Sequence, residues 1–410
     1  MCKTMFLFGS GADTDANGNL DSGQSFARSL LLNGYAAQIK KITGIEAGRY
    51  KILYSTSKKI YVQSIMSKYN EDTDAFDEET EKIFGEEILN QIKAYYKHDD
   101  EKVDIKNLCD RWYKLFVEVN DCENEQKNFF LKNAVFFDSL DEKFNSLRNN
   151  KLNSNAKRVV VAYWNVYLQI FHALYGKKDN IDYSYENIFE ILEKNTYETS
   201  INQNCYYKKL KGSKLINDND YFVSTTNYTS ILSEFFYEED ISWLHGRLNW
   251  FEDLENLQVY DCNKDNERKQ ILKNREAGHT VLPFILIPSG VKPLICKKQI
   301  KQFSHFIDNL ESCNRLVVVG YRFNSEDNHI NSIIGEWLSK EDKQLLCFSY
   351  NNTIDIKQLS WLPKPIDKPI EFKEDGTELL GDNEILFVNV NENNAMKAFE
   401  QLIKELENKE

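Results

Sequence analysis

Short polar motifs that could bind a nucleotide directly follow three apolar runs of the sequence. Gly-Ser-Gly-Ala (9–12) follows "TMFLF", Thr-Thr-Asn (225–227) follows "YFVS", and His-Gly (245–246) follows "ISWL". A glycine-rich turn lets backbone N–H groups approach a diphosphate, and ligands of doubly wound folds bind at the carboxyl ends of the strands. Asparagine both donates and accepts hydrogen bonds, and histidine accepts protons near neutral pH. The motifs therefore predict a nucleotide site that can also transfer a proton.

The first motif opens a longer stretch that also fits a calcium loop. From Asp13 the sequence reads D-x-D-x-N-G-x-x-D, with oxygen ligands at Asp13, Asp15, Asn17 and Asp21. Such a loop needs a helix on either side and a bidentate glutamate at position 12, where this chain has Gln24. The run before it has strand length and composition, and Asp, Asn and Gly are common in turns. The nucleotide interpretation is favoured, with Asp13 to Asp21 expected to form an acidic lip over the pocket.

The strands that would position these motifs are short, apolar and rich in β-branched residues. Runs of this kind occupy residues 4–9, 221–226, 241–246, 283–290, 315–321, 344–350 and 384–390. Amphipathic segments that could cover a sheet occupy residues 26–39, 229–239, 298–310, 328–340 and 395–409. Apolar strands that alternate with helices are typical of a parallel sheet covered on both faces. We therefore expect an α/β fold with a Rossmann-like, doubly wound parallel sheet.

A helical domain is expected after the first βα unit. All six prolines lie after residue 282, so the first two-thirds of the chain can form long helices. A 3.6-residue apolar period occurs in the segments 79–96, 106–119, 156–176 and 185–195. The aromatic-rich segment 156–176 is expected to lie in the core or at a subunit interface. The predicted domains are a nucleotide-binding domain at 1–45 and 216–410 and a helical insertion at 46–215.

Composition limits the class of protein. The chain has 410 residues, of which 41% are apolar and 13% aromatic, and this indicates a folded globular protein. The formal charge is −13 with basic residues scattered among acids, which argues against direct binding of nucleic acid. The eight cysteines never form C-x-x-C, so neither disulfides nor a zinc knuckle is expected. Without a signal peptide or a run of roughly 20 apolar residues, a cytoplasmic protein that does not bind membranes is expected.

The order and spacing of the motifs resemble the sirtuin family. A sirtuin begins with a G-A-G-x-S phosphate turn, continues with T-Q-N-x-D and H-G, and later carries a G-T-S-type turn. Residues 9–12, 225–227 and 245–246 match the first three motifs in order, and Gly320-Tyr321 with "FNSEDNHI" resembles the last. The resemblance covers strand ends over nearly the full length of the chain, but not the helical insertion.

The departures from the family pattern indicate an activity other than protein deacylation. The chain lacks the paired C-x-x-C motifs of a zinc ribbon, and its first loop lacks P-D-F-R. Thr229 stands where the family has an aspartate that recognises the nicotinamide amide. Together with the helical insertion, this combination resembles the sirtuin-like NADases of bacterial antiphage defence systems. The resemblance implies hydrolysis of NAD⁺ to nicotinamide and ADP-ribose by an abortive-infection effector.

The resemblance also implies roles for individual residues in cleavage of the glycosidic bond to nicotinamide. Asn227 would orient the ribose hydroxyls and a water molecule, and His245 would accept a proton from a ribose hydroxyl or from that water. NAD⁺ is then the substrate, and no metal is expected. The residues expected to bind NAD⁺ are Gly9, Ser10, Gly11, Ala12, Thr225, Thr226, Ser289, Gly290, Gly320 and Tyr321.

Several of these polar residues also have a structural interpretation. Asn227 or Thr229 could cap a helix over residues 229–239, and Asp327 could cap the helix that follows it without touching a ligand. His279 and His329 are interpreted as structural or rim residues.

An enzyme that destroys NAD⁺ must stay inactive until infection, so we expect gating by homo-oligomerisation or by a separate partner protein. The resemblance suggests a HerA-type translocase or a subunit of a Kongming-type NADase complex. The alternatives are a sirtuin-type deacylase or ADP-ribosyltransferase, a non-catalytic sensor that binds NAD⁺ or ADP-ribose, and, from residues 13–21 alone, a calcium-binding protein.

Overall fold

The computed structural model of the chain describes most of the two terminal parts and scattered residues between them. The described residues are 3–17, 42, 69–70, 72–78, 81, 86, 89–90, 93, 164, 167–168, 170–176, 184–197, 199–216, 221–286, 296–324, 327–350, 359, 361–363, 370–373, 379–380 and 384–409. The predicted helices at 26–39 and 106–119 lie outside this part of the chain. The division into domains at residues 45 and 215 stays a prediction.

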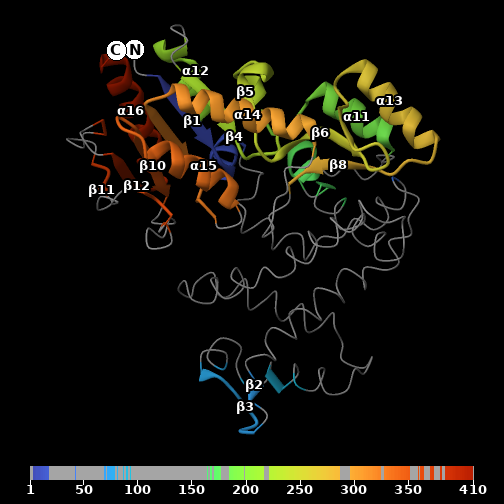
Figure 1. Ribbon diagram of the computed structural model, residues 1–410, viewed down its shortest axis with the longest axis horizontal. Helices are drawn as coiled ribbons and strands as arrows, with labels where there is room; N and C mark the ends of the chain where they lie inside the picture. The colour runs from blue at the N-terminus through green and yellow to red at the C-terminus, as the bar shows by residue number, and fades with distance from the viewer. Residues whose placement is uncertain are drawn as a thin grey trace.

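Seven parallel strands form the central sheet, in the order β11-β12-β10-β9-β1-β4-β5 (Figure 1). They are β1 (Thr4–Phe8), β4 (Tyr221–Thr225), β5 (Ile241–Trp243), β9 (Arg315–Val319), β10 (Gln344–Tyr350), β11 (Ile370–Glu371) and β12 (Ile385–Val390). If the two-residue strand β11 is set aside, the strands follow the spatial order 3-2-1-4-5-6 of doubly wound folds. The predicted Rossmann-like α/β fold is confirmed. Its strand order reverses between β1 and β9.

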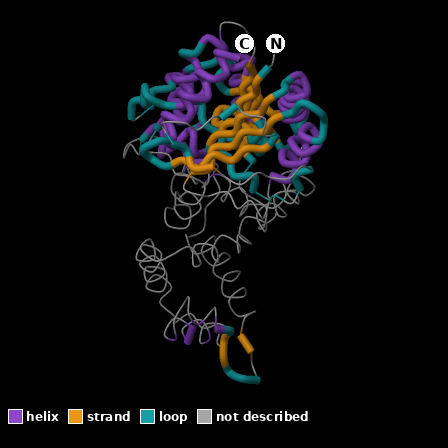
Figure 2. The backbone as a smooth tube through the Cα atoms, turned by 90° about the vertical axis from the view of Figure 1, so that its left-hand side faces the viewer, coloured by secondary structure: helices purple, strands orange, loops and turns teal. Residues whose placement is uncertain are grey.

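Side chains of the central strands alternate between two apolar cores. In β1, Phe6 and Phe8 belong to the core on one face, and Met5 and Leu7 belong to the core on the other. Helices lie on both sides of the sheet (Figure 2). The first core includes residues of α1 (Ser10–Ala16), α12 (Tyr206–Lys211) and α16 (Ala395–Lys409), and the second includes residues of α14 (Lys297–Ser312) and α15 (Asn328–Leu338). Burial on both faces explains why these strands are nearly continuous apolar runs.

A second, antiparallel sheet follows β5 in the chain and has the order β7-β6-β8. It consists of β6 (Gly246–Asp253), β7 (Gln258–Asp261) and β8 (Val281–Ile285), with α13 (Asp265–Glu276) before β8. The sequence placed the run 283–290 in the parallel sheet, and this prediction is wrong because the described part of that run pairs with β6. The run was misassigned because β8 is buried at all five positions, so its composition is that of a central parallel strand.

The predicted helix at residues 229–239 is also wrong. Two 3₁₀ turns, η3 (Ile231–Glu234) and η4 (Glu238–Asp240), take its place. The residues before η3 are held against the small sheet, since Leu248 N–H donates to the carbonyl of Tyr228 at 2.9 Å. Tertiary context at this backbone hydrogen bond overrides the local helical preference of the segment. The other predicted helices near β9, β10 and the C-terminus are confirmed as α14, α15 and α16.

Aromatic residues that are far apart in the sequence pack around Phe251 of β6, in the antiparallel sheet. Trp164, Tyr167 and Phe189 surround Phe251, with ring centroids 6.3, 5.9 and 5.0 Å from it. Phe189 belongs to α11 (Tyr185–Lys194), which is the predicted helix at 185–195. The core position predicted for the segment 156–176 is confirmed for its described residues.

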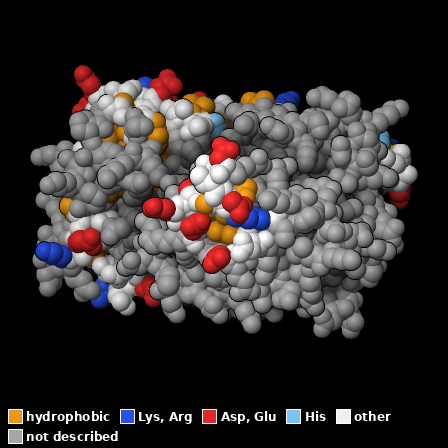
Figure 3. Space-filling view, turned by 90° about the horizontal axis from the view of Figure 1, so that it is seen from below, with side chains coloured by type: hydrophobic (Ala, Val, Ile, Leu, Met, Phe, Trp, Pro, Cys, Tyr) orange, Lys and Arg blue, Asp and Glu red, His pale blue; other side chains and the backbone are white. Residues whose placement is uncertain are grey.

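A short hairpin of β2 (Tyr69–Asn70) and β3 (Ala75–Phe76) lies far from both sheets (Figure 1). Its turn and the residues after it carry four exposed acids, Asp72, Asp74, Asp77 and Glu78. Acidic side chains accordingly gather on the face of the molecule drawn in Figure 3. Among the described residues, no helix is both long enough and apolar enough to cross a membrane.

Candidate functional site

The predicted motifs meet at the carboxyl edge of the central sheet. Strands β1, β4 and β5 are neighbours in the sheet, so Gly9, Asn227 and His245 follow the ends of three adjacent parallel strands. Gly9 lies more than 200 positions before Asn227 and His245 in the chain, but all three share one edge of the sheet. In doubly wound folds this edge is where ligands bind.

Two threonines connect the ends of β1 and β4. The Thr225 hydroxyl donates to the carbonyl of Phe8 at 3.0 Å and accepts the N–H of Asn227 at 3.0 Å. The N–H of Thr226 donates to the same Phe8 carbonyl at 3.1 Å. Both side chains are buried, so the contacts found for these two predicted NAD⁺-binding residues hold the strand ends together.

Three glycines allow α1 to pack directly on the end of β9, and we call them the glycine contact: Gly9, Gly11 and Gly320. The N–H of Gly9 donates to Val319 at 2.9 Å, and the N–H of Gly11 donates to Gly320 at 3.2 Å. A Cβ on Gly9 would lie 2.4 Å from the Gly320 carbonyl oxygen, and a Cβ on Gly320 would lie 2.5 Å from the nitrogen of Ala12. Gly320 also has φ +70°, which favours glycine. Backbone packing therefore requires glycine here.

The amide groups expected to bind phosphate already have partners within the protein. Besides the two N–H groups of the glycine contact, the N–H of Ala12 donates to the carbonyl of Gly9 at 2.9 Å. Of the residues in this turn, Ser10 and Gly11 are exposed, whereas Gly9 and Ala12 are buried. Ser10 and Gly11 are therefore the part of the turn that a ligand can contact.

Asp13 is buried in the protein and does not form part of an acidic lip, so that prediction is wrong for this residue. The hydroxyls of Tyr207 and Thr229 each donate to one oxygen of its carboxylate. Burial raises the pKa of Asp13 to about 6, although hydrogen bonds from Thr229, Tyr207 and Asn227 oppose this rise. We call these four residues the Asp13 network. Because Asp13 lies within helix α1, with its oxygens bound to hydroxyls, the calcium-loop interpretation is also wrong.

Asn227 is held in one orientation by its amide nitrogen. Its Nδ2 donates to the carbonyl of Gly9 at 3.0 Å and to the Tyr207 hydroxyl at 3.3 Å. Its Oδ1 accepts no hydrogen bond from any other described residue, so the side chain offers an acceptor at the sheet edge. Asn227 and Thr229 do not cap a helix, because the 3₁₀ turn η3 that follows has Ser230 at its N-cap and both side chains join the Asp13 network.

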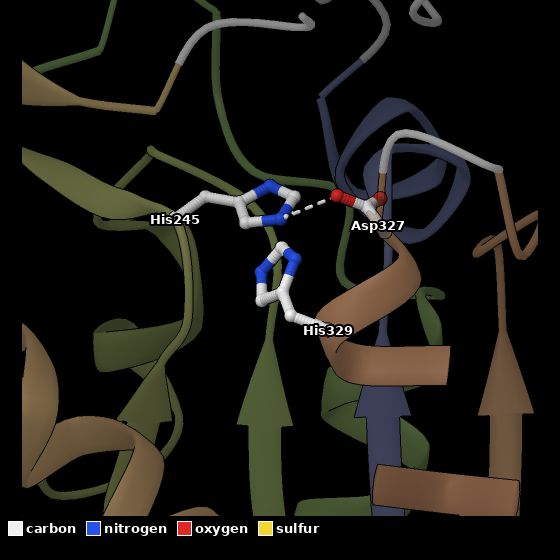
Figure 4. A group of neighbouring side chains, drawn as sticks. All are labelled: His245, Asp327 and His329. Carbon is white, nitrogen blue, oxygen red and sulfur yellow. Dashed lines mark ion pairs between the residues drawn. The ribbon is translucent and has the colours of Figure 1, made fainter. Parts of the chain in front are cut away.

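His245 forms a buried pair with Asp327, a residue that the sequence suggested to be a helix cap. The His245 Nε2 lies 3.0 Å from the Asp327 Oδ1, and the two side chains are 6% and 4% exposed (Figure 4). Asp327 does occupy the N-cap position of α15, but its side chain forms no capping hydrogen bond. The carboxylate lies at the start of α15 and contacts His245, which follows the end of β5. Sequence analysis missed Asp327 as a site residue.

Aromatic and polar groups surround this pair. The ring centroids of His329 and Tyr228 lie 6.4 and 6.2 Å from that of His245. Tyr321 is buried, and burial together with the charge of Asp327 and a hydrogen bond with its carboxylate raises the pKa of the Tyr321 phenol well above the usual value. Its hydroxyl donates to Asn331 at 3.0 Å. The hydroxyl of this predicted NAD⁺-binding residue therefore faces the interior of the protein.

Two clusters of side chains contain enough donor atoms for a metal ion. His245, Asp327 and His329 bring three donor atoms within 4.8 Å of one another, a set that zinc or iron can use. Asp253, His279 and Glu255 form the second cluster. The absence of a metal from the reaction stays a prediction.

The second cluster is a hydrogen-bonded turn of the small sheet. Asp253 accepts hydrogen bonds from the backbone of Glu255 and from the side chains of Asn256 and Asn274. It also lies 2.8 Å from the Nδ1 of His279. These contacts explain the burial of Asp253 and agree with the structural interpretation of His279.

Two predicted ligand-binding residues, Ser289 and Gly290, lie outside the described residues. Ser325, which neighbours Asp327 in the sequence, lies outside them as well. The site therefore consists of Ser10, Gly11, Asn227, His245 and Asp327. The spacing Asp-x-His at 327–329, six positions after the end of the predicted strand 315–321, is the signal in the sequence that could have indicated Asp327.

Two solved structures of Sir2 proteins are similar to part of this chain. One, described under "Structural Basis for the Mechanism and Regulation of Sir2 Enzymes", has a TM-score of 0.30 and 12% identity and covers 54% of this chain and 80% of its own. Another, Sir2Af2 bound to a myristoylated histone peptide, has a TM-score of 0.29 and 11% identity and covers 55% of this chain and 81% of its own. No protein-family model matches the sequence, and no curated protein matches it.

Proposed function

We propose that this protein is an NAD⁺ glycohydrolase that releases nicotinamide and ADP-ribose. One observation carries the proposal: Asn227 and His245 follow the ends of adjacent strands beside the glycine turn after β1. The strand order reverses between β1 and β9, and nucleotides bind next to this point in doubly wound folds. An acceptor on Asn227 and a carboxylate-paired histidine at this edge are suited to hydrolysis of a glycosidic bond.

The reaction breaks the bond between C1′ of the ribose and the pyridinium nitrogen. Nicotinamide leaves as a neutral molecule, positive charge develops on the ribose, and water attacks C1′. His245 accepts the proton that the water loses, and this proton is then released to solvent. The Asn227 Oδ1 accepts a hydrogen bond from a ribose hydroxyl or from the water, because its Nδ2 is bound to Gly9 and Tyr207.

The diphosphate would contact the exposed part of the first turn. Ser10 and Gly11 are exposed there, whereas the amides of Gly9 and Ala12 have backbone partners. The Ser10 hydroxyl and backbone are the groups we assign to phosphate. Gly9, Gly11 and Gly320 support binding indirectly, since only glycine allows the close approach between the first turn and β9.

The test is nicotinamide release from NAD⁺ by the purified chain and its variants. Asn227→Ala and His245→Ala should each lower the rate by about 10² to 10⁴-fold, the usual size of a positioning or proton-transfer contribution. His279→Ala is the matched control, because this histidine is also paired with an aspartate but lies between α13 and β8. Equal rates in the parent and in the Asn227 and His245 variants would contradict the site assignment.

Other outcomes would identify a different function. Saturable binding of NAD⁺ without nicotinamide release would indicate a sensor. Nicotinamide release that depends on an acyl-lysine peptide would indicate a deacylase, and release that ends with a modified protein would indicate an ADP-ribosyltransferase. Each outcome is read from the products, namely free ADP-ribose, O-acyl-ADP-ribose or ADP-ribosylated protein.

The biological setting that we propose is an abortive-infection effector of antiphage defence. The sequence resemblance to sirtuin-like NADases of such systems supports this setting. The enzyme would be gated by its own oligomerisation or by a partner such as a HerA-type translocase or a Kongming-type complex subunit. Cellular NAD⁺ should fall during phage infection in cells that carry the complete system, and should stay constant with the His245→Ala variant.

A further inference from the structure

We propose that Tyr207 is a positioning residue of this site, which fixes the side-chain amide of Asn227 with its oxygen directed to the substrate. This role rests on the function proposed above for Asn227, but the contact between the two side chains can be tested separately. Tyr207 belongs to α12 and lies in the segment 46–215, which the sequence assigned to a helical insertion. A residue outside the predicted nucleotide-binding domain therefore supports the site.

The amide nitrogen of Asn227 is surrounded by hydrogen-bond acceptors. Its Nδ2 donates to the carbonyl of Gly9 at 3.0 Å and to the Oη of Tyr207 at 3.3 Å. A hydrogen bond from Asn227 to the carboxylate of Asp13 also acts to lower the pKa of that group. A carbonyl oxygen only accepts hydrogen bonds, so the amide atom that faces Gly9 must be the nitrogen. These contacts leave the amide oxygen, Oδ1, for a ligand.

Tyr207 can accept this hydrogen bond because its own proton is used elsewhere. Its hydroxyl donates to the Oδ1 of Asp13, and the Thr229 hydroxyl donates to the Oδ2. Burial and the neighbouring charge of Asp13 raise the pKa of Tyr207 well above its usual value, so the phenol keeps its proton. The lone pairs of the phenolic oxygen are then available to the Nδ2 of Asn227. Asp13 thereby makes Tyr207 an acceptor, and not a donor, toward Asn227.

The ring of Tyr207 is fixed by packing, so its hydroxyl has a defined position. Tyr207 is fully buried, and its ring contacts those of Phe8 and Phe235, with centroids 4.9 and 5.9 Å away. Phe8 is the last residue of β1, so this packing holds the ring at the sheet edge that carries Asn227. A buried, rigid support of this kind keeps a functional side chain in its productive geometry.

Loss of the Tyr207 hydroxyl should loosen the amide of Asn227 without removing it from the site. In Tyr207→Phe the ring packing is kept and the Gly9 carbonyl still binds Nδ2, whereas the hydrogen bond to the phenol is lost. Misplacement of a catalytic group by about 1 Å can lower the rate by about 10²-fold. Because the Gly9 contact remains, we expect a smaller loss, of about tenfold in kcat for nicotinamide release.

A double-mutant cycle shows whether Tyr207 acts through Asn227. Tyr207→Phe should lower kcat about tenfold in the parent but less than about twofold in the Asn227→Ala background, because the group that it positions is absent there. The rates are measured at about pH 8, where Asp13, with its pKa of about 6, is ionised. An equal loss in both backgrounds would overturn the proposal, since a general defect of the fold would lower both rates alike.

Tyr185→Phe is the matched control for removal of a buried hydroxyl. The Tyr185 hydroxyl donates to the carbonyl of Val281, and this contact joins α11 to β8 without involving Asn227. Tyr185→Phe should therefore keep kcat within about twofold of the parent, whereas both variants should unfold at a lower temperature than the parent. A loss of kcat equal to that of Tyr207→Phe would overturn the proposal.

The contact itself can be measured by NMR without enzymatic activity. In protein labelled with ¹⁵N-asparagine, the side-chain signals of Asn227 are identified by their absence from Asn227→Ala. The parent should show a nuclear Overhauser effect between the Nδ2 protons and the ring protons of Tyr207. In Tyr207→Phe, one of the two Nδ2 protons should exchange with solvent at least about tenfold faster than in the parent. Absence of the Overhauser effect, or unchanged exchange, would overturn the proposal.

Failure of the positioning role and failure of the proposed function give different results. If the parent releases no nicotinamide, the glycohydrolase function fails, and the NMR measurement still decides whether Tyr207 orients Asn227. If the parent and Tyr207→Phe release nicotinamide at the same rate, the function stands and the positioning role fails. The Overhauser effect in the parent needs no change at position 207, so it decides the contact even if Tyr207→Phe does not fold.

Discussion

Two buried carboxylates lie at the carboxyl edge of one sheet, and their partners are of different kinds. Asp13 binds the hydroxyls of Tyr207 and Thr229, which are neutral at physiological pH. Asp327 binds the imidazole of His245, which can carry a charge. Both residues are buried, with 3% of each whole residue exposed, so burial alone does not distinguish them.

The partner decides what a buried acid can do. Neutral donors satisfy the oxygens of Asp13 but supply no opposite charge, so burial prevails and its pKa rises to about 6. Such a group holds α1, α12 and the segment after β4 together. An imidazole partner can gain and lose a proton, so the pair of His245 and Asp327 can take part in a reaction. We therefore infer that Asp13 stabilises the fold, whereas Asp327 belongs to the part of the edge that can take part in a reaction.

The largest expected effect comes from breaking the glycine contact on the Asp13 side of the edge. Gly320→Ala should destabilise the protein by about 2 to 5 kcal/mol, because φ is +70° and the new Cβ would lie 2.5 Å from the nitrogen of Ala12. Gly278→Ala is the matched control, since φ is +87° but no atom lies within 4 Å. It should cost only about 1 to 2 kcal/mol. Thermal and urea unfolding measure both, and equal losses would contradict the packing role.

A smaller effect should appear in the pH dependence of stability. The pKa of Asp13 is raised from 3.8 to about 6, so its protonated form is favoured in the folded state. The corresponding stability is fully present below pH 3.8 and is lost as the pH rises through about 6, by about 3 kcal/mol in total. The Asp13→Asn variant has no carboxyl group at this position, so it does not lose this stability as the pH rises. The free energy of unfolding of the parent relative to the variant should therefore fall between pH 4 and 7; a constant difference would show that Asp13 stays charged.

The smallest effect is expected at the second histidine–aspartate pair, in which His279 is partly exposed and Asp253 is buried. The hydrogen bond that the Nδ1 of His279 donates to Asp253 raises the pKa of His279 above 6.5. Stability from this pair is present below pH 6.5 and is lost as the pH rises through the higher folded value. His279→Gln should thus be less stable than the parent at pH 6 and equal to it at pH 9. A pH-dependent change in the free energy of unfolding as large as that expected for Asp13 would mean that the partial exposure of His279 does not weaken this pair.

The sequence predicted the fold class well because strands and helices have local signatures. Seven apolar runs and five amphipathic segments were recognised, and all but one of the strands lie in the predicted sheet. The prediction for residues 283–290 was wrong because a fully buried strand has the same apolar composition in a parallel and in an antiparallel sheet. The helix at 229–239 failed because a contact between Tyr228 and Leu248, distant in the sequence, overrode the local preference.

The site was predicted less completely because its contacts join distant residues. Asn227 and His245 were found, since each directly follows an apolar strand and belongs to a motif in order. Asp327 was assigned to a cap because N-capping is the local use of an aspartate before a helix. Asp13 was assigned to a surface loop because acids beside Asn and Gly usually form exposed turns.

By itself, the sequence determined which strands exist, their near-continuous apolar character and the polar residues at their ends. These are local properties that depend on side-chain type and period. Only the tertiary structure decided which carboxylate meets which partner, because the two acids that matter lie 314 positions apart and reach the same edge through strand order. The amide of Asn227, the hydroxyl of Thr229 and the ring of His245 acquire their partners in the same way.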